Sequence, residues 1–441
     1  MTADPNRSVT LPAPFAAAAR LQPYWWERTP RPQLPATTPP ERCDVAIVGS
    51  GYTGLHAAIQ TARAGRSTVV FDAEDAGFGC SARNGGQVST SVKPTLAMLA
   101  RRHGTDRAQA ILGEGRRSLS WLGEFIGAEN IDCDFGVVGR YHAAHNPAQF
   151  SAMARRVEAM TGGADPEARI VTRAEQHREI DTDAYHGGVV YTRHASLDPA
   201  RYHQGLLQRA LDAGVQVIPH CAVTGLQRDG AETQVRTARG QVRARDVVVA
   251  TNGYTGALTP WLRRRVIPIG SYMIATEPMP VERVRALIRN NRIVSDTRKV
   301  VYYYRASPDQ TRIVFGGRVS VMETDPRISG PILHRDLVGI FPSLAGTAIS
   351  HSWCGFVAYT FDELMHLGCR DGIHYAMGYC GSGVGMGSYL GMRIGQQVLG
   401  RPEGRTAFDG LAFPTRPLYS GRPWFLAPTI RYYRWRDRMP W

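Results

Sequence analysis

One stretch near the N-terminus constrains the fold more than any other part of the chain. Residues 44–54 read Asp-Val-Ala-Ile-Val-Gly-Ser-Gly-Tyr-Thr-Gly, so a run of buried-strand residues passes directly into a Gly-x-Gly-x-x-Gly turn. Residues 55–64 have helical composition, and a second apolar strand, 68–71, ends in Asp72. Strand, glycine turn, helix, strand and acid in this order predict a dinucleotide-binding βαβ unit.

The three glycines of the turn have separate physical roles. Gly49 makes the tight turn, Gly51 lets the backbone approach a pyrophosphate, and Gly54 lets the helix pack on the strand. The free N–H groups of the first helical turn, at Tyr52 and Thr53, and the positive end of the helix dipole attract phosphate. Asp72 follows Gly54 by 18 residues, where a carboxylate binds the ribose hydroxyls.

Composition places the chain among ordinary globular enzymes. It has 441 residues, of which 43% are hydrophobic and 20% charged, so we expect two domains. No apolar run approaches the roughly 18 residues of a membrane span, and the N-terminus lacks a secretory pattern. We therefore expect a cytoplasmic protein. The seven cysteines are scattered without a Cys-x-x-Cys, which favours buried thiols over a metal site.

The formal net charge of +14 is almost entirely due to arginine, because Lys93 and Lys299 are the two lysines. Such an excess is compatible with nucleic acid, an anionic surface or an anionic substrate. The arginines are spread along the chain, with local clusters at 263–265 and 431–438. We interpret them as a surface bias with a few residues that neutralise cofactor phosphates, and we expect no nucleic-acid partner. Oligomeric state stays open.

The order of patterns predicts an α/β protein, α+β overall, whose Rossmann-like domain is assembled from separate segments. Residues 1–40 contain nine prolines, which predicts an arm without regular structure. We assign 41–93, 190–258 and 350–410 to the nucleotide domain. An inserted mixed-sheet substrate domain comprises 94–189 and 259–349, and a tail, 411–441, packs on the body.

Five different motifs are spread over most of 23–425. They are Val48–Leu55, Gly79–Gln87, Ala250–Tyr254 with Pro268 and 275–278, Trp353-x-Gly355 with Thr360 and 365–368, and Gly378–Gly383. In combination they resemble the D-amino-acid-oxidase-like family of FAD-dependent oxidoreductases, within it the γ-glutamylputrescine-oxidase-like branch. The resemblance implies FAD rather than NAD, and oxidation of a C–N bond by hydride transfer to the flavin.

The resemblance also implies which residues hold the FAD. Beyond the first turn they are Ser81, Arg83, Asn84, Gly85, Gly86, Gln87, Val223, Thr251, Gly381, Gly383 and Val384. A helix expected to begin near Ser388 aims N–H groups at the flavin's pyrimidine edge. Sarcosine oxidases link their flavin to a cysteine in the strand of the Trp-x-Gly motif, but here Gly355 rather than Cys354 is in register with it. We therefore expect non-covalent FAD.

Departures from the family pattern bear on the substrate. Ser382 stands where many relatives have histidine. The strand segment 356–358 has no arginine for an α-carboxylate, which favours an amine over an α-amino acid. Candidate catalytic and wall residues are Tyr272, Tyr304, Arg305, Trp353 and Ser382. Alternation along the strand pairs Tyr302 with Tyr304 and Tyr303 with Arg305, and the sequence leaves open which pair faces the pocket.

We therefore expect oxidation of a small amine, either a polyamine conjugate or a secondary amine, to an imine. The imine hydrolyses to an aldehyde or keto product plus amine or ammonia. The acceptor is O2, an electron-acceptor protein or a quinone. The choice among these acceptors stays open because 312–316 lacks the lysine that activates oxygen in sarcosine oxidases. Two alternatives also stay open: an amine-oxidising enzyme acting on a modified tRNA base, and a D-amino-acid or glycine-type oxidase or dehydrogenase.

Overall fold

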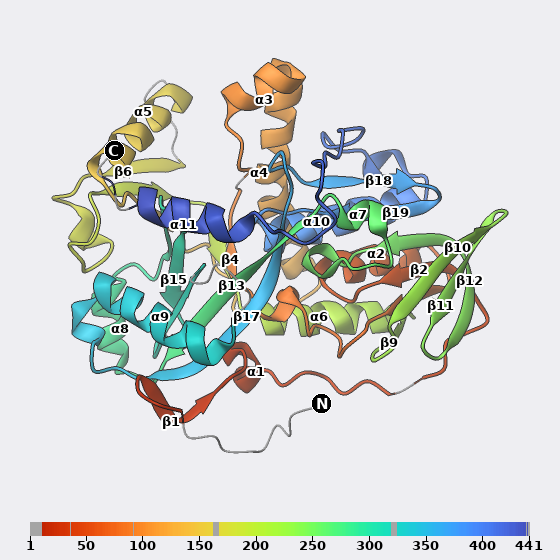
Figure 1. The fold of residues 1–441 in the computed structure, drawn as a ribbon, viewed down its shortest axis with the longest axis horizontal. Helices are drawn as coiled ribbons and strands as arrows, with labels where there is room; N and C mark the ends of the chain where they lie inside the picture. Colours follow the sequence, from red (N-terminus) through yellow and green to blue (C-terminus); the bar gives the residue numbers. More distant parts are fainter. Residues whose placement is uncertain are drawn as a thin grey trace.

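The structure is a computed structural model that describes residues 11–35, 37–90, 92–161, 167–318, 324–437 and 439. It has a mixed α/β fold, as predicted, with two large sheets side by side and helices packed around and between them (Figure 1). Among the described helices, none combines the length and apolarity needed to cross a bilayer.

Helices and strands alternate along the whole chain. The helices are α1 (Tyr24–Arg28), α2 (Tyr52–Arg63), α3 (Leu96–His103), α4 (Thr105–Ala128), α5 (Pro147–Thr161), α6 (Pro199–Asp212), α7 (Pro260–Arg263), α8 (Val281–Leu287), α9 (Pro326–Ile340), α10 (Gly383–Val398) and α11 (Leu426–Arg436). The strands are β1 (Phe15–Arg20), β2 (Arg42–Val48), β3 (Thr68–Phe71), β4 (Gln87–Val88), β5 (Arg140–Ala143), β6 (Ala168–Val171), β7 (Gly188–Tyr191), β8 (Ala195–Ser196), β9 (Gln216–Ile218), β10 (Val223–Asp229), β11 (Glu232–Thr237), β12 (Gly240–Val249), β13 (Ile267–Thr276), β14 (Ile293–Asp296), β15 (Tyr302–Ala306), β16 (Ile313–Gly317), β17 (Ile349–Tyr359), β18 (His366–Arg370) and β19 (Ile373–Met377).

The eight-stranded sheet has a parallel centre. Its order is β10-β11-β12-β2-β3-β9, and β19 pairs in parallel with the second half of β12. The apolar run 45–48 in β2 is buried, as expected for a parallel strand covered on both faces. The helices α2, α6 and α10 share a core with this sheet, so the N-termini of α2 and α10 are held at its carboxyl edge.

The nine-stranded sheet forms the other half of the molecule, in the order β1-β17-β13-β16-β15-β14-β5-β7-β6. Neighbours β13 and β17 pair along their full length. Ile267 lies opposite Tyr359 at one end, and Thr276 lies opposite Ile349 at the other. The helix α9 packs on this pair. It begins at Pro326 because the side chain of Asp325 accepts a hydrogen bond from the Arg327 N–H group and caps it.

Two expectations about these segments need correction. The proline-rich arm was expected to lack regular structure, yet 15–20 forms β1 and 24–28 forms α1, because β1 pairs with β17 at the edge of the larger sheet. The strand β17, which was assigned to the nucleotide domain from residue 350, pairs within the larger sheet. The remaining domain boundaries stay a prediction.

Candidate active site

A cavity of about 2390 Å³ is lined by segments of both large sheets. Pockets for one small ligand usually measure roughly 300–1,000 Å³. The lining runs from the turn after β2, past the loop 77–88 and the start of α10, to β13, β15 and α11. The cavity therefore has room for a large cofactor and a substrate together.

The glycine turn between β2 and α2 forms one end of this cavity. Gly49 has φ +105°, in the region that favours glycine. Gly51 caps α2, and a Cβ there would lie 2.9 Å from Ser81 Oγ. A Cβ on Gly54 would lie 1.9 Å from the Gly49 carbonyl oxygen, so the absence of a side chain at Gly54 lets α2 pack closely on the turn. Gly54 itself is not among the lining residues. Tyr52 and Thr53 line the cavity at the start of α2.

Asp72 follows β3 and also lines this end. Its Oδ2 accepts hydrogen bonds from the Ser50 N–H group, at 2.8 Å, and from the Ser50 hydroxyl, at 2.5 Å. These bonds hold the carboxylate beside the glycine turn, where it is placed to accept a ribose hydroxyl. Val223 and Thr251 line the cavity as well.

The loop 77–88 is shaped by its own side chains. Ser81 Oγ accepts a hydrogen bond from the Tyr52 N–H group at 3.0 Å. The Asn84 amide donates to the carbonyl of Cys80 at 3.1 Å and accepts from the Gly86 N–H group at 2.8 Å. Ser81, Asn84 and the adjacent Gly85 line the cavity, whereas Gly86 lies behind the lining. The loop is therefore preformed next to the helix N-terminus.

Two longer side chains tie the same loop to the larger sheet, and both line the cavity. Arg83 donates to the carbonyl of Cys354 at 3.1 Å, and burial lowers the pKa of this guanidinium. Gln87 donates to the carbonyls of Val294, at 3.2 Å, and Tyr304, at 3.1 Å. The loop is thus fixed relative to both sheets.

The start of α10 faces the cavity from a third side. Gly378 and Gly381 have φ values of +81° and +100°. The helix begins at Gly383, so the expected start near Ser388 was too late, because the glycine-dense composition was interpreted as a loop. Gly381, Ser382, Gly383 and Val384 all line the cavity. Free N–H groups there suit negative charge on a bound ring.

The helices α2 and α10 are in direct backbone contact. A Cβ on Gly391 would lie 2.5 Å from the carbonyl oxygen of Thr53. The Thr53 hydroxyl donates to the carbonyl of Gly387 at 2.9 Å and shares a 2.7 Å hydrogen bond with the Tyr379 hydroxyl. The two helix N-termini that line the cavity are therefore fixed relative to each other.

Three predicted aromatic wall residues lie outside the cavity lining. Tyr304 is fully buried, and its hydroxyl donates to Tyr185 at 3.2 Å. The indole of Trp353 donates to the carbonyl of Arg83 at 2.8 Å, and the hydroxyl of Tyr272 accepts from the Thr324 N–H group at 2.9 Å. These side chains support the walls from behind, because their strand positions face the core.

Arg305 is also displaced from its predicted place. Its guanidinium is buried behind the lining and donates to the carbonyls of Gly86, at 3.1 Å, and Leu197, at 2.9 Å. Burial lowers its pKa to about 10. Arg305 therefore anchors the loop 77–88 and, unlike the wall residue it was predicted to be, does not line the cavity.

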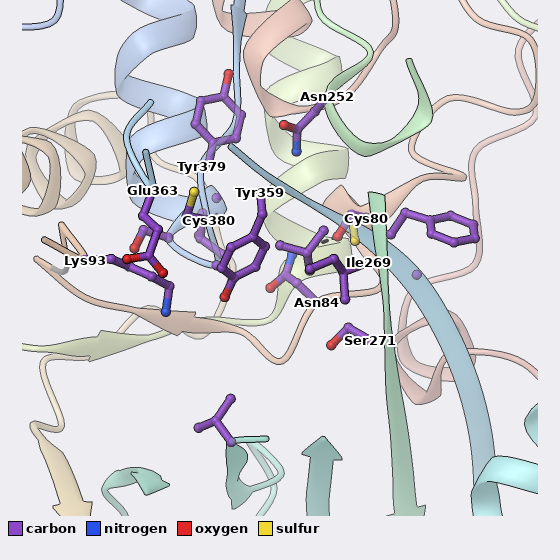
Figure 2. A pocket seen from close by; sticks show the side chains of 18 of the residues that line it. Cys80, Asn84, Lys93, Asn252, Ile269, Ser271, Tyr359, Glu363, Tyr379 and Cys380 are labelled. Atoms are coloured by element: carbon purple, nitrogen blue, oxygen red, sulfur yellow. Dashed lines mark hydrogen bonds between the residues drawn. The ribbon is translucent and has the colours of Figure 1, made fainter. Parts of the chain in front are cut away.

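Other side chains line this part of the cavity instead, including Tyr303 and Arg318. Lys93, Ser271 and Tyr359 line it as well (Figure 2). Tyr303 and Ser271 share a 2.6 Å hydrogen bond. Alternation along β15 had left the choice between Tyr303 and Tyr304 open; Tyr303 lines the cavity, whereas Tyr304 packs against Phe315 in the core. Lys93 was missed because it comes from the loop after the nucleotide-binding unit; its rarity in this arginine-rich chain was the available signal.

A further part of the lining includes two cations, Arg140 and Arg156. Burial lowers the pKa of Arg140. Burial and the nearby Arg140 lower the pKa of His142 to about 3 and that of His194 to about 2. Both imidazoles are neutral at neutral pH. We call this region, formed by Arg140, His142, Arg156 and His194, the basic pole; it suits an anionic group.

The fold and the cavity together define a dinucleotide-binding protein in which a second large sheet forms the opposite part of the cavity wall. The comparison with protein families gives the particular group. The chain belongs to the DAO family, described as FAD dependent oxidoreductase, which matches residues 44–397. It is therefore an FAD-dependent amine or amino-acid oxidoreductase.

Relatives agree over nearly the whole chain. Gamma-glutamylputrescine oxidoreductase of Escherichia coli is 32% identical over 402 residues, which cover 90% of this chain and 93% of the relative. Probable oxidoreductase OrdL of Haemophilus influenzae is 28% identical over 436 residues, which cover 96% and 99%. The crystal structure of glycine oxidase from Geobacillus kaustophilus has a TM-score of 0.71 at 19% identity. The match covers 86% of this chain and 99% of that chain, which shows the shared fold.

The cavity residues fit FAD, since a Cβ on Gly51 would fill the phosphate cradle and a second helix N-terminus faces the far end. We expect acid precipitation to release all of the flavin and leave a colourless pellet. Gly355 lines the cavity in register with the linking position, and burial raises the pKa of the neighbouring Cys80 to about 12, so its thiol stays unreactive. A yellow pellet that turns colourless in Cys80→Ala or Cys354→Ala would contradict this.

Proposed function

We propose that this protein oxidises a C–N bond of a small amine that carries a distal acidic group, such as an acidic polyamine conjugate. When bound, FAD would supply the hydride acceptor for the carbon next to nitrogen. The imine product then hydrolyses to an aldehyde and ammonia or an amine. The protein orients the amine and excludes water from it.

The observation that carries this proposal is where the cations lie. The lining from β17 includes Phe356 and Val357 and no cation from 356–358. An α-carboxylate held there would find no cation on this strand segment, and the nearby cations Arg318 and Lys93 already contact Tyr359; burying a carboxylate without a partner costs several kcal/mol. The basic pole, by contrast, offers Arg140 to an acid at the other end of the substrate, and a guanidinium binds a carboxylate with two parallel hydrogen bonds.

The name of the E. coli relative supports the same substrate class. It specifies gamma-glutamylputrescine, an amine conjugate, for a protein that is 32% identical to this chain. The side chains that would hold such a substrate are Ser271 and Tyr303 near the reacting end and the basic pole at the distal end.

The test is anaerobic bleaching of the flavin by matched amines. We expect an N-acylated diamine with a terminal carboxylate to reduce the flavin at concentrations at least about tenfold lower than its neutral amide, since a charge-assisted hydrogen bond contributes roughly 1.5–3 kcal/mol. D-alanine and glycine should be slow. Fast bleaching by these amino acids and none by the amines would sink the proposal.

A variant pair locates the acid-binding end. Arg140→Gln should remove the preference for the carboxylate over the amide and leave the limiting rate with the amide unchanged. Arg169→Gln is the matched control, because Arg169 lies outside the lining and is paired with Glu179. A preference that survives in Arg140→Gln would place the distal acid elsewhere.

A further inference from the structure

Tyr359 occupies a junction in the cavity wall. It is the last residue of β17, and its hydroxyl lies 3.7 Å from where a Cβ on Gly381 would stand, beside the start of α10. Figure 2 places its ring in the middle of the labelled side chains, with Lys93 and Glu363 to one side and Ile269 and Ser271 to the other. The hydroxyl therefore sits between the cofactor end and the substrate end.

Two cations act directly on this phenol. The guanidinium of Arg318 donates a hydrogen bond to the Tyr359 hydroxyl and stacks 4.4 Å from the ring centroid. The Lys93 ammonium lies 5.5 Å from the same centroid. A cation that donates to the oxygen favours the phenolate over the phenol.

Three other titratable groups lie around the ring or in the lining beside it. Cys380 and Tyr303 face it from the loop before α10 and from β15, and Glu363 lines the cavity as an exposed side chain. Burial raises the pKa of Tyr359, but Arg318 and Lys93 outweigh it and the net pKa is lowered. For Tyr303, burial instead raises the pKa to about 12.

We propose that Tyr359, as the phenolate paired with Arg318, is the catalytic base that takes the proton from the substrate's ammonium group. This inference rests on the function proposed above and adds the proton acceptor to it. An alkyl ammonium has a pKa of about 10, so only about one molecule in a thousand is neutral at pH 7.

The step balances with groups already present. The ammonium N–H bond breaks, its proton forms the Tyr359 O–H bond, and the electron pair stays on nitrogen. That pair is then free to form the second C–N bond when the carbon gives up its hydride, for which bound FAD would be the acceptor. Arg318 stays protonated throughout and compensates the charge of Tyr359 before the transfer.

The decisive measurement is the pH dependence of flavin reduction in Tyr359→Phe, followed anaerobically in single turnovers. General-base catalysis contributes roughly 10²–10⁴-fold, so we expect a loss of at least about 100-fold near pH 7. The loss should shrink to less than about tenfold near pH 10, because free amine is then abundant. Tyr303→Phe, the matched control, should change the rate by the same factor at every pH.

A second readout needs no turnover. Ultraviolet difference titration of the FAD-loaded protein should show one phenol ionising below the others, and Tyr359→Phe should remove that step. Arg318→Gln should move the step to higher pH, whereas Arg318→Lys should restore part of the shift.

The outcomes separate the two proposals. A wild type that no amine bleaches at any pH overturns the proposed function and this inference with it. A wild type that is bleached, with a pH-independent loss in Tyr359→Phe, overturns this inference alone and leaves Tyr359 a positioning residue. An unchanged titration in Tyr359→Phe overturns it equally.

Discussion

Replacing Gly51 by valine is expected to abolish FAD retention. The Cβ alone would stand 2.9 Å from Ser81 Oγ, and the two methyl groups beyond it would occupy the space that a pyrophosphate needs at the N-terminus of α2. We expect at least a 100-fold rise in the dissociation constant of FAD, about 3 kcal/mol. Purified protein should be colourless, and titration of the apoprotein with FAD measures the change.

Two further variants show whether the effect is local. Gly339→Val places the same side chain in α9, at an exposed glycine whose Cβ would meet nothing within 4 Å, and should keep its flavin. Gly51→Ala combined with Ser81→Ala removes the contact with Ser81 and should recover part of the affinity. Undiminished FAD occupancy in Gly51→Val would place the nucleotide elsewhere.

Replacing Gly391 by alanine is expected to destabilise the protein, although alanine is the better helix former. The added methyl group would stand 2.5 Å from the carbonyl oxygen of Thr53 and 2.7 Å from its Cα, so α10 must move away from α2. Overpacking of this kind costs about 1–3 kcal/mol. Urea unfolding of the FAD-loaded protein, followed by flavin fluorescence and by circular dichroism, measures the loss.

The same substitution at Gly339 should have the opposite sign. Its Cβ would meet nothing within 4 Å, so the higher helix propensity of alanine should leave stability unchanged or raise it by up to about 1 kcal/mol. If both variants lost stability equally, close contact between α2 and α10 would not be the cause.

Local pattern and the family resemblance together predicted most of the residues that line the cavity next to the glycine turn and the start of α10. The apolar run 45–48, the glycine turn and Asp72 are consecutive in the chain, and the resemblance supplied the loop 77–88 and the residues before α10. These features depend on backbone conformation and glycine, which sequence encodes directly. Of the predicted cofactor residues, Gly54 and Gly86 alone lie behind the described lining, because both permit close packing.

Side-chain direction on the substrate half could not be obtained in the same way. The run 302–304 is three tyrosines, so the sequence does not distinguish the two strand faces. Packing of Tyr304 against Phe315 in the core leaves Tyr303 to line the cavity. Arg305 lies on the face of Tyr303 yet bonds to backbone carbonyls. The prediction that the arm 1–40 lacks regular structure was wrong for a related reason. The strand β1 has no partner nearby in the sequence and pairs with the distant β17.

The pairing of β19 with β12 and the contact of α10 with α2 also govern how the protein is made. A chain synthesised from its N-terminus exposes the glycine turn long before residues 373–398 emerge. Contacts between such distant segments form slowly, and the apolar faces of β2 and α2 stay uncovered meanwhile. The nucleotide-binding site is therefore incomplete until the last third of the chain has been synthesised. A nascent chain cut short before α10 would carry the complete motif and still fail to capture its cofactor.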